Sequence, residues 1–429
     1  MIWIYRILIN LAIPFGIFGL IVRGFKNPEY WRRWGERFGF ANAEVISSAP
    51  FDLWIHAVSV GEARAATPLV QALLDKRPEA RILVTTTTPT GSAMVHLQLK
   101  NRVQHCYFPY DLAWAMRGFT KLVSAKTILI METEIWPNFI ASAKAAGSQL
   151  IYTNVRMSER SYKKYARFPK WVRSTLSQVD HFAVQGYLDR KHLQALGVEV
   201  DRITETGSIK FDVTIAPSLR ESAEVLRRQL GQDRLIWIAG STRENEESKI
   251  LAVYKKLKPQ FPSLLLLLVP RHPQRFDYIA RKVQRRDLEC VRRTEQADTL
   301  ALSADIDVYL GDTMGELSLM YAASDLAFVG GSLEPLGGQN ILEPCALGVP
   351  VVFGPHMFNF PDISRWTIKE KAGRMVKNEG ELLTVVSELL GNPSLRDEMG
   401  SRGVSFIEAH KGALDKNSRL IENLTKSIV

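Results

Sequence analysis

Two carboxylates and a lysine lie near the ends of apolar segments that predict strands, and these residue types can catalyse group transfer. Glu62 follows the apolar run Leu53–Val60, and Gly61 before it allows a tight turn that directs the carboxylate outward. A carboxylate at such a turn can take a proton from an attacking hydroxyl group as a general base. It can equally do no more than complement the dipole of the helix that it begins, and the sequence leaves both interpretations open.

The second carboxylate, Glu132, ends the apolar run Thr127–Met131 and is followed by Glu134. A carboxylate that is partly buried at a strand end ionises at a cost unless a cation or a hydrogen-bond donor lies near it. Lys210, in the segment Gly207–Asp212, can supply that positive charge, although it can also be an ordinary surface lysine.

Two glycine pairs lie in the segment Gly330–Pro355, between a predicted strand and a predicted short helix. Glycines at such a turn let backbone N–H groups approach a phosphate, and the start of a helix adds a favourable field for an anion. Beside the second pair, Asn340 can donate to phosphate oxygens and Glu343 can accept from ribose hydroxyls. The segment is neither a Walker A loop nor GxGxxG, and it can be only a tight turn, but two glycine pairs with these two side chains favour a nucleotide site. In a further glycine turn, Gly311–Leu317, Glu316 or the backbone near it can also hold a nucleotide.

The elements that position these residues alternate between strand and helix along most of the chain. Alternation of this kind predicts parallel sheets with helices on both faces, and ligands of such sheets bind beyond the carboxyl ends of the strands. The predicted fold class is α/β, with two doubly wound Rossmann-like domains facing a cleft. The clearest strands are expected at Leu53–Val60, Arg81–Thr87, Thr127–Met131, Gln149–Thr153, His181–Val184, Ile203–Thr206, Leu235–Ala239, Leu264–Val269, Asp307–Leu310 and Leu326–Val329.

The length of 429 residues exceeds what one hydrophobic core usually holds, which also favours two domains. We expect a hydrophobic membrane-anchor helix at residues 1–25 and a first Rossmann-like domain at residues 26–215. A second Rossmann-like domain is expected at residues 216–405, and a C-terminal helix at residues 406–429.

Net charge and cysteine content restrict the class of protein further. A formal net charge of +10 favours an anionic partner, which can be nucleic acid, a membrane surface or a phosphorylated substrate. The 3 cysteines are widely separated, so a disulfide framework and a zinc site are both unexpected, and a reducing compartment is indicated. His56, His272 and His356 lack ligand spacing, and the DxD match at Asp305–Asp307 begins a strand; we predict no metal site.

The apolar run Ile2–Val22 is close to the length that spans a bilayer. Basic residues follow it, so the positive-inside rule places the rest of the chain in the cytoplasm. A cleavable signal peptide fits poorly, because the basic residues follow the run and no small-residue cleavage site comes after it. Arg6 and Pro14 interrupt the run and leave open a helix that lies in the membrane interface.

A basic stretch interleaved with aromatic residues runs from Arg156 to Arg173. This pattern suits single-stranded nucleic acid and suits equally an anionic membrane surface. The apolar N-terminal run favours the membrane, although some of these residues can simply form a solvated helix face. The stretch contains Arg156, Arg160, Tyr162, Lys163, Lys164, Tyr165, Arg167, Phe168, Lys170, Trp171 and Arg173.

A series of motifs, taken together and in order, resembles the family of 3-deoxy-D-manno-octulosonic acid (Kdo) transferases of lipopolysaccharide synthesis. The resemblance extends over nearly the whole chain. The motifs are HAVSVGE, TTTTPTG, FPYD, METEIWP, TNVRMSERS, GSIKFD, AGSTRENEE, LVPRHPQRF, GDTMGEL and GGSLEPLGGQNILEP.

The resemblance implies a GT-B type glycosyltransferase with an inverting, metal-independent reaction and no cofactor, which takes Kdo from the co-substrate CMP-Kdo. The first domain would bind the acceptor, lipid IVA, the phosphorylated precursor of lipid A, at the cytoplasmic face of the inner membrane, in contact with anionic lipids and without nucleic acid. Glu62 would be the general base, with Glu132 and Lys210 stabilising the transition state. The second domain would bind the donor through Arg271, His272, Gly311, Asp312, Thr313, Met314, Gly315, Glu316, Gly337, Gly338, Gln339, Asn340 and Glu343.

Two alternatives are considered beside this one. One is another membrane-associated GT-B enzyme, such as a UDP-sugar transferase or a sugar-nucleotide epimerase. The other is a non-catalytic membrane-bound protein that binds nucleotide or nucleic acid. The sequence does not specify the number of Kdo units, the acyl-chain preference or the oligomeric state.

Overall fold

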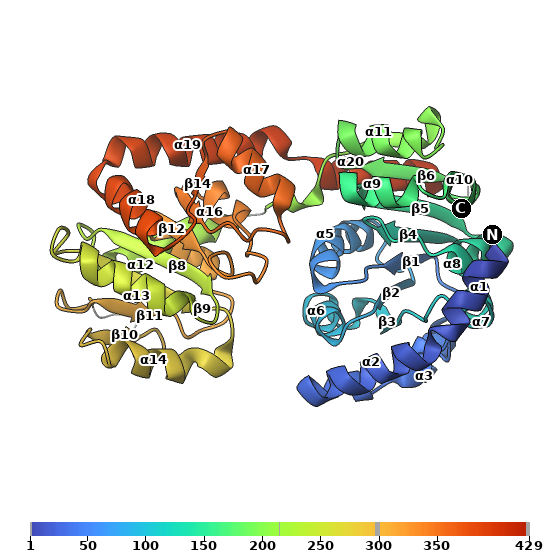
Figure 1. Cartoon of the computed structure of the whole chain (residues 1–429), viewed down its shortest axis with the longest axis horizontal. Helices are drawn as coiled ribbons and strands as arrows, with labels where there is room; N and C mark the ends of the chain where they lie inside the picture. Colours follow the sequence, from blue (N-terminus) through green and yellow to red (C-terminus); the bar gives the residue numbers. More distant parts are fainter. Residues whose placement is uncertain (1, 214, 297–300, 426–429) are drawn as a thin grey trace. The chain divides into compact units, whose positions relative to one another are not determined.

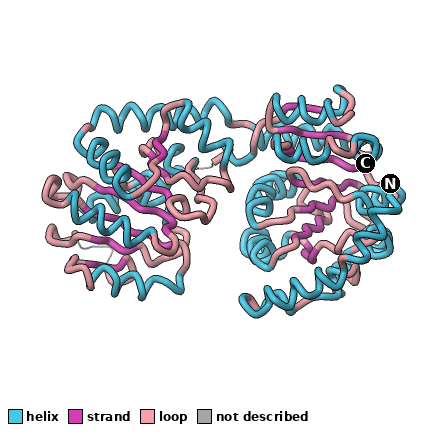
Figure 2. The backbone as a smooth tube through the Cα atoms, in the orientation of Figure 1, coloured by secondary structure: helices cyan, strands magenta, loops and turns pink. Residues whose placement is uncertain are grey.

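The computed structural model describes residues 2–213, 215–296 and 301–425. The chain forms two compact domains, each an α/β unit with strands inside and helices outside (Figures 1 and 2). The N-terminal domain comprises Met1–Asp212 together with Lys411–Val429, and the C-terminal domain comprises Val213–His410.

In the described part of the N-terminal domain, seven parallel strands form one sheet in the order β3-β2-β1-β4-β5-β6-β7. This order places β1 and β4 side by side at the point where the direction of strand addition reverses. In doubly wound sheets that point is where ligands bind. The strands are β1 Leu53–His56, β2 Ile82–Thr86, β3 Gln104–Tyr107, β4 Thr127–Met131, β5 Gln149–Val155, β6 His181–Val184 and β7 Ile203–Glu205.

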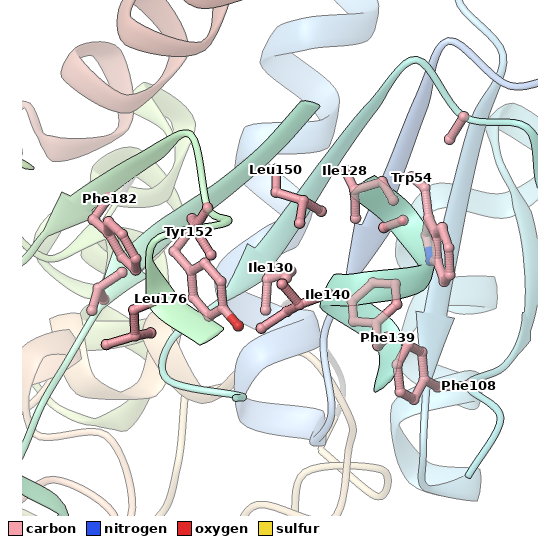
Figure 3. Close-up of a cluster of buried hydrophobic side chains, with 14 of the residues drawn as sticks. Trp54, Phe108, Ile128, Ile130, Phe139, Ile140, Leu150, Tyr152, Leu176 and Phe182 are labelled. Carbon is pink, nitrogen blue, oxygen red and sulfur yellow. The ribbon is translucent and has the colours of Figure 1, made fainter. Parts of the chain in front are cut away.

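Helices cover both faces of this sheet. Successive residues of a strand point to opposite faces, and β1 shows this directly, because Trp54 belongs to one apolar core while Leu53 and Ile55 belong to the other. Figure 3 shows the first of these cores, where Trp54 packs on Phe139 with their ring centroids 4.9 Å apart. The helices are α1 Ile2–Leu11, α2 Ile13–Lys26, α3 Trp34–Arg37, α4 Ala43–Ser48, α5 Val60–Lys76, α6 Pro89–Leu99, α7 Ala113–Val123, α8 Pro137–Ala145, α9 Glu159–Tyr165, α10 Pro169–Leu176, α11 Tyr187–Ala195 and α20 Ala413–Thr425, with 3-10 turns η1 Pro28–Trp31, η2 Lys100–Arg102, η3 Val200–Arg202 and η4 Ile209–Phe211.

The C-terminal domain repeats this plan. Its described residues form a second sheet of seven parallel strands in the order β10-β11-β9-β8-β12-β13-β14, so the reversal point lies between β8 and β12. The strands are β8 Ile236–Thr242, β9 Leu265–Pro270, β10 Cys290–Arg292, β11 Val308–Leu310, β12 Leu326–Val329, β13 Val351–Phe353 and β14 Gly373–Met375. The helices are α12 Pro217–Leu230, α13 Glu246–Leu257, α14 Phe276–Gln284, α15 Leu317–Ala322, α16 Leu342–Ala346, α17 Pro361–Lys369, α18 Glu379–Gly391 and α19 Pro393–His410, with the 3-10 turn η5 Pro273–Arg275.

The prediction of two doubly wound α/β domains is confirmed, and the strands that the sequence did not reveal are all short edge strands. β3, β10 and β14 have the sequences QHCY, CVR and GRM, which lack the apolar runs of the central strands. They become strands because the neighbouring strand offers a row of backbone hydrogen-bond partners, which no local pattern displays.

The single hydrophobic helix expected at the N-terminus is instead two helices, α1 and α2, with a break at Ala12. Pro14 lies at the start of α2, where its missing N–H group costs nothing, whereas in the middle of one long helix it would remove a hydrogen bond. The two helices are bent by 43° relative to each other. Among the described residues, no single helix has the length and apolar character of a membrane span, and only this bent pair passes such a test jointly.

A C-terminal helix is expected at residues 406–429, of which the structure describes 406–425. These comprise the end of α19, a break at Gly412 and then α20. Gly412 has φ +91°, a conformation that side chains disfavour. The carboxylate of Asp212 accepts hydrogen bonds from the backbone N–H groups of Gly412 and Leu414, at 2.7 and 2.6 Å. Those bonds fix the start of α20, which returns to pack on the N-terminal domain.

Candidate active site

Glu62 lies in the first turn of α5, directly beyond β1, and is only 8% exposed. Its carboxylate accepts hydrogen bonds from the backbone N–H of Val58 at 2.8 Å and from the Ser59 hydroxyl at 3.0 Å. The Ser59 oxygen in turn accepts the N–H of Glu62 at 3.3 Å, so the two residues cap the helix reciprocally. These bonds hold the carboxylate at the carboxyl end of β1, as the sequence predicts.

Glu132 and Lys210 meet at the neighbouring strand end. Glu132 follows β4 directly and adopts φ +55°, which is uncommon for a residue with a side chain and directs this carboxylate away from the strand path. The ammonium group of Lys210, in η4, donates to the Glu132 carboxylate at 3.0 Å. Both side chains are about three-quarters buried, so Lys210 is not an ordinary surface lysine.

The site concentrates negative charge. Burial raises the pKa of Glu62 to about 8, and the nearby carboxylates of Glu132 and Glu134 raise it further in the same direction. Burial, with help from Glu132, raises the pKa of Glu134 to about 7. A carboxylate whose pKa lies near the operating pH is suited to accept a proton and return it. The structure thus brings Glu62, Glu132, Glu134 and Lys210 into one electrostatic group at the reversal point of the sheet.

Residues that the sequence analysis did not single out hold this group in place. Asn154, with φ +54°, accepts the backbone N–H of Ile209 on its side-chain oxygen at 3.1 Å and so fixes the turn that carries Lys210. Tyr152 donates its hydroxyl to the carbonyl of Glu134 at 2.7 Å, and Thr133 donates to the carbonyl of Arg156. The sequence signals for Asn154 and Thr133 are the motifs TNVRMSERS and METEIWP, and Tyr152 lies in the predicted strand Gln149–Thr153.

His56, which ends β1, is fully buried and stacks on Phe108 with ring centroids 3.7 Å apart. Its Nδ1 lies 3.0 Å from the hydroxyl of Thr85, and burial lowers its pKa to about 3. His56 is therefore a neutral core residue. Among the described residues, no group of three His, Cys, Asp or Glu side chains is arranged to hold a metal ion.

In the C-terminal domain, the first glycine pair does not offer its backbone to a phosphate. The carboxylate of Glu246, which is fully buried, accepts the N–H groups of Gly331, Ser332 and Leu333 at 2.6, 2.9 and 2.9 Å, and that of Arg243 at 2.9 Å. The N–H of Gly330 donates to the carbonyl of Gly240 at 2.9 Å, so both N–H groups of the first pair have partners within the chain, and the expectation that they cradle an anion is wrong. Glu246 ties the turn after β12 to the turn after β8, which are neighbours only in the folded sheet.

The second glycine pair is required by packing. Gly337 and Gly338 have φ +98° and +73°, and a Cβ at either position would lie 2.3 Å from Asn359 or 2.2 Å from Met357. Asn340 donates from its side-chain nitrogen to the Glu343 carboxylate at 3.1 Å, so the two predicted ligands are directly paired. Gln339 is partly exposed. Its side-chain nitrogen lies 3.4 Å from the position that a Cβ atom on Gly331 would occupy, so Gln339 borders the first glycine pair.

Positive charge gathers at the ends of β8 and β9. Arg271 and His272 follow β9, and the N–H of Arg271 donates to the carbonyl of Thr242 at 3.0 Å. Burial lowers the pKa of His272, and the positive charges of Arg243 and Arg271 lower it in the same direction. Arg243, absent from the predicted set, borders Gly331 with its side chain. Arg271, His272, Arg243 and Gln339 therefore belong to the same edge of the second sheet.

The turn Gly311–Glu316 has its carboxylates already paired. Asp312 accepts Arg292 at 2.7 Å and the Thr294 hydroxyl at 2.7 Å, and these partners lower its pKa against the opposing effect of burial. Glu316 pairs with Arg293 at 3.1 Å and accepts the hydroxyl of Thr313. Both carboxylates thus have partners within the domain, and their contacts with the donor stay predictions. Backbone groups here, and the Met314 side chain, which is 60% exposed, remain predicted donor contacts. Gly311 is required by packing, since a Cβ there would lie 2.8 Å from the Met320 sulfur, and Gly315 has φ +90°.

Comparison with known proteins identifies the family. A family model described as 3-deoxy-D-manno-octulosonic-acid transferase (kdotransferase) matches residues 32–213. The 3-deoxy-D-manno-octulosonic acid transferase of Haemophilus influenzae is 38% identical over 393 residues, which cover 91% of this chain and 91% of that protein. The chain belongs to the Kdo transferase family. The enzyme of Bordetella pertussis, under the same name, is 36% identical over 395 residues, which cover 90% of each protein.

Solved structures agree on the architecture. A glycosyltransferase from Rickettsia africae superposes with a TM-score of 0.56 at 14% identity, over 88% of this chain and 100% of that one. The UDP-GlcNAc 2-epimerase of Neisseria meningitidis gives a TM-score of 0.57 at 14% identity, over 87% and 99%. At such identity these likenesses show the fold alone, namely two successive Rossmann-like domains of the GT-B type.

This Kdo transferase is therefore a glycosyltransferase, as the sequence motifs predicted. Its 38% identity to a named Kdo transferase, against 14% to the epimerase, decides against the epimerase alternative and against a non-catalytic binder. The catalytic and donor-binding residues themselves stay predictions.

Proposed function

We propose that the enzyme transfers Kdo from CMP-Kdo to lipid IVA by an inverting displacement with Glu62 as general base. The observation that carries this proposal is the position of Glu62 at the carboxyl end of β1, held there by Val58 and Ser59, beside the end of β4, where Glu132 binds Lys210. Burial also raises the pKa of Glu62 to about 8. A general base gains a proton affinity matched to neutral pH.

The chemical step is a single displacement. Glu62 takes the proton of the acceptor hydroxyl while the oxygen attacks the anomeric carbon of Kdo. The bond between that carbon and the phosphate oxygen breaks, and CMP leaves with the electron pair. Attack on the side opposite to the leaving group inverts the anomeric configuration. The proton stays on Glu62 until solvent removes it.

Lys210 and Glu132 support this step from the same domain. The ammonium group of Lys210 can stabilise negative charge that develops during displacement, and Glu132, bound to it at 3.0 Å, fixes its position. Positively charged side chains would stabilise the negative charge that a metal ion stabilises in other enzymes. We therefore propose a reaction without metal or cofactor.

The donor would be held by the C-terminal domain. Arg271 and His272 lie at the end of β9 and would contact the phosphate, with Arg243 beside them. The Asn340–Glu343 pair would meet the ribose, and the turn Gly311–Glu316 the base. Backbone N–H groups of the first glycine pair have no part in this proposal, because that of Gly331 donates to Glu246 and that of Gly330 donates to the carbonyl of Gly240.

The acceptor would be an anionic lipid at the cytoplasmic face of the inner membrane. The net charge of +10 and the basic stretch in the N-terminal domain complement a bis-phosphorylated lipid and the anionic lipids around it. The apolar N-terminal segment suits a substrate that is itself embedded in a bilayer.

Mass spectrometry of the product tests the proposal. Purified enzyme, CMP-Kdo and lipid IVA in detergent should yield lipid IVA heavier by one or more Kdo units, together with free CMP. The same assay with UDP-GlcNAc should give no product. Transfer from a uridine sugar, or CMP release without a modified lipid, would contradict the assignment of substrates.

A further inference from the structure

The helix α20, near the end of the chain, borders both parts of the proposed catalytic group. It belongs to the N-terminal domain, where Figure 1 draws it at the red end of the colour scale, and it packs on α5, β5 and η4. Ala413 and Ile421 of α20 share an apolar core with Ile209 of η4 and with the inner face of α5. Because α5 carries Glu62 and η4 carries Lys210, one helix supports the elements of both residues.

Asp212 fastens one end of the turn that carries Lys210 to α20. It follows η4 directly, and its carboxylate accepts the backbone N–H groups of Gly412 and Leu414 at 2.7 and 2.6 Å. These N–H groups lie at the start of α20, where the helix itself offers no acceptor and its dipole favours a carboxylate. Asn154 holds the other end of η4, so the turn is fixed on both sides.

A second connection runs from α20 to the backbone of Glu132. Asn417 is fully buried; its side-chain oxygen accepts the hydroxyl of Thr153 at 2.7 Å, and its side-chain nitrogen donates to the carbonyl of Ala413 at 2.8 Å. Thr153, also fully buried in β5, accepts the N–H of Glu132 on its carbonyl at 3.0 Å. A buried amide without partners is costly, so these bonds favour a single position of α20 against β5.

The Glu132–Lys210 pair depends on supports of this kind. Lys210 reaches Glu132 through a flexible four-carbon side chain. Glu132 has φ +55°, an uncommon conformation that persists only where the surrounding structure fixes it. Displacement of a catalytic group by ~1 Å can lower a rate by ~100-fold. Residues that fix these two backbone segments can therefore govern the rate without contact with the reacting atoms.

We infer that Asp212 and Asn417 are positioning residues, through which α20 holds the Glu132–Lys210 pair in its reactive arrangement. Asp212 acts on the turn that carries Lys210. Asn417 acts through Thr153 on the backbone of Glu132. The inference rests on the proposed function, because it requires that this pair stabilises the transition state.

A double-substitution cycle tests Asp212. Asp212→Ala, assayed with CMP-Kdo and detergent-dispersed acceptor, should lower kcat at least ~10-fold and leave KM for the donor within ~2-fold, because the donor would bind the other domain. In a Lys210→Met background the same change should lower kcat by less than ~2-fold, because the group that Asp212 positions is absent. Asp212→Asn keeps one acceptor oxygen and should recover part of the loss. Equal losses in both backgrounds would overturn the role of Asp212, since a loosened fold would lower kcat whether or not Lys210 is present.

Asp180→Ala is the matched control. The carboxylate of Asp180 also accepts a backbone N–H, that of Leu150 at 2.7 Å, and pairs with Lys144 at 2.9 Å, so its loss should lower the unfolding temperature without lowering kcat. A similar fall in kcat for this control would overturn the inference.

The single variant Lys210→Met separates the inference from the proposed function. A normal kcat in Lys210→Met would contradict the proposed role of the pair, and the inference would fall with it. A low kcat in Lys210→Met, with a further full loss on adding Asp212→Ala, would overturn the inference alone.

The same design tests Asn417. Thr153→Val removes the hydroxyl that binds Asn417 but keeps the shape of the side chain, and it replaces Asn417→Ala if that variant does not fold. We expect either change to lower kcat ~10-fold in the wild-type enzyme, with KM for the donor unchanged, and by less than ~2-fold in a Glu132→Gln background. Equal losses in both backgrounds, or a normal kcat in a folded variant of reduced stability, would overturn the role of Asn417.

Discussion

Glu62→Gln separates the catalytic interpretation of this residue from the capping one. The substitution keeps the size and shape of the side chain and one acceptor oxygen, but the amide cannot take a proton at neutral pH. If Glu62 is the general base, turnover should fall by ~10²–10⁴-fold, while binding of CMP, which involves the other domain, should change little. A capping residue alone would give a stability change and near-normal turnover.

The raised pKa adds a second, independent signature. At a pKa of about 8, only about a tenth of the enzyme carries an ionised Glu62 at pH 7, so kcat/KM should rise ~10-fold between pH 7 and pH 9. The free energy of unfolding of the wild-type protein should instead fall as the pH rises. The folded protein retains the Glu62 proton from the ordinary pKa of 4.5 up to about 8, whereas the unfolded chain has lost it, so wild-type stability falls as pH rises through that window.

The size of this effect follows from the two pKa values. Each pH unit between them corresponds to ~1.4 kcal/mol, so the penalty above pH 8 is at most on the order of 5 kcal/mol. The amide of the Glu62→Gln variant does not titrate, so its free energy of unfolding lacks this pH-dependent loss. We therefore expect the variant to gain stability relative to wild type on going from pH 5 to pH 9, even though it has lost its activity.

Two measurements on the same preparations decide the matter. One is the pH profile of kcat/KM with detergent-dispersed acceptor, and the other is calorimetric unfolding of the N-terminal domain at pH 5 and pH 9. Glu79→Gln, an exposed change of the same charge in the same domain, is the control and should alter neither. A Glu62→Gln enzyme with more than a tenth of wild-type turnover, or a stability difference that does not vary with pH, would refute the reasoning.

Other substitutions test the remaining parts of the site. Lys210→Met removes the charge but keeps the length, and we expect kcat to fall at least tenfold with KM for the donor little changed; a purely KM effect in steady-state kinetics would contradict a role in the transition state. Asn340→Ala and Glu343→Ala should each weaken CMP binding in calorimetric titration by ~1.5–3 kcal/mol, and unchanged affinity in both would leave that turn with a structural role only. Glu246→Gln places an amide against four backbone N–H donors and should cost the C-terminal domain ~3 kcal/mol or more in urea unfolding, whereas a loss below ~1 kcal/mol would show that the turn does not depend on this carboxylate. Tyr5→Phe removes the hydrogen bond that the Tyr5 hydroxyl donates to the Asp111 carboxylate and should cost ~1.5–3 kcal/mol in unfolding of the N-terminal domain, whereas an unchanged stability would show that this bond does not hold α1 on the domain.

Some features of the fold could not be predicted from local sequence patterns, and they share one reason. Edge strands such as β14, with the sequence GRM, have no pattern of their own and are created by a neighbouring strand. Pro14 marks an interruption of the first helix in the sequence, but the hydrogen bonds of Tyr5 to Asp111 and of Arg6 to Asn138 join residues more than a hundred positions apart. Distant pairs of this kind leave no periodicity in a single sequence.

For the site, the sequence determined which residues stand at the carboxyl ends of strands, since apolar runs of strand length end at Glu62, Glu132 and the glycine turns. Together with the motif order, this was enough for the fold class and the family. Only the tertiary structure decided what each group does there. It paired Glu132 with Lys210, raised the pKa of Glu62 by burial beside other carboxylates, and filled the first glycine turn with Glu246. The reason is physical: a local pattern fixes where a side chain leaves the backbone, whereas its charge state and its partners depend on burial and on atoms that the fold brings from elsewhere in the chain.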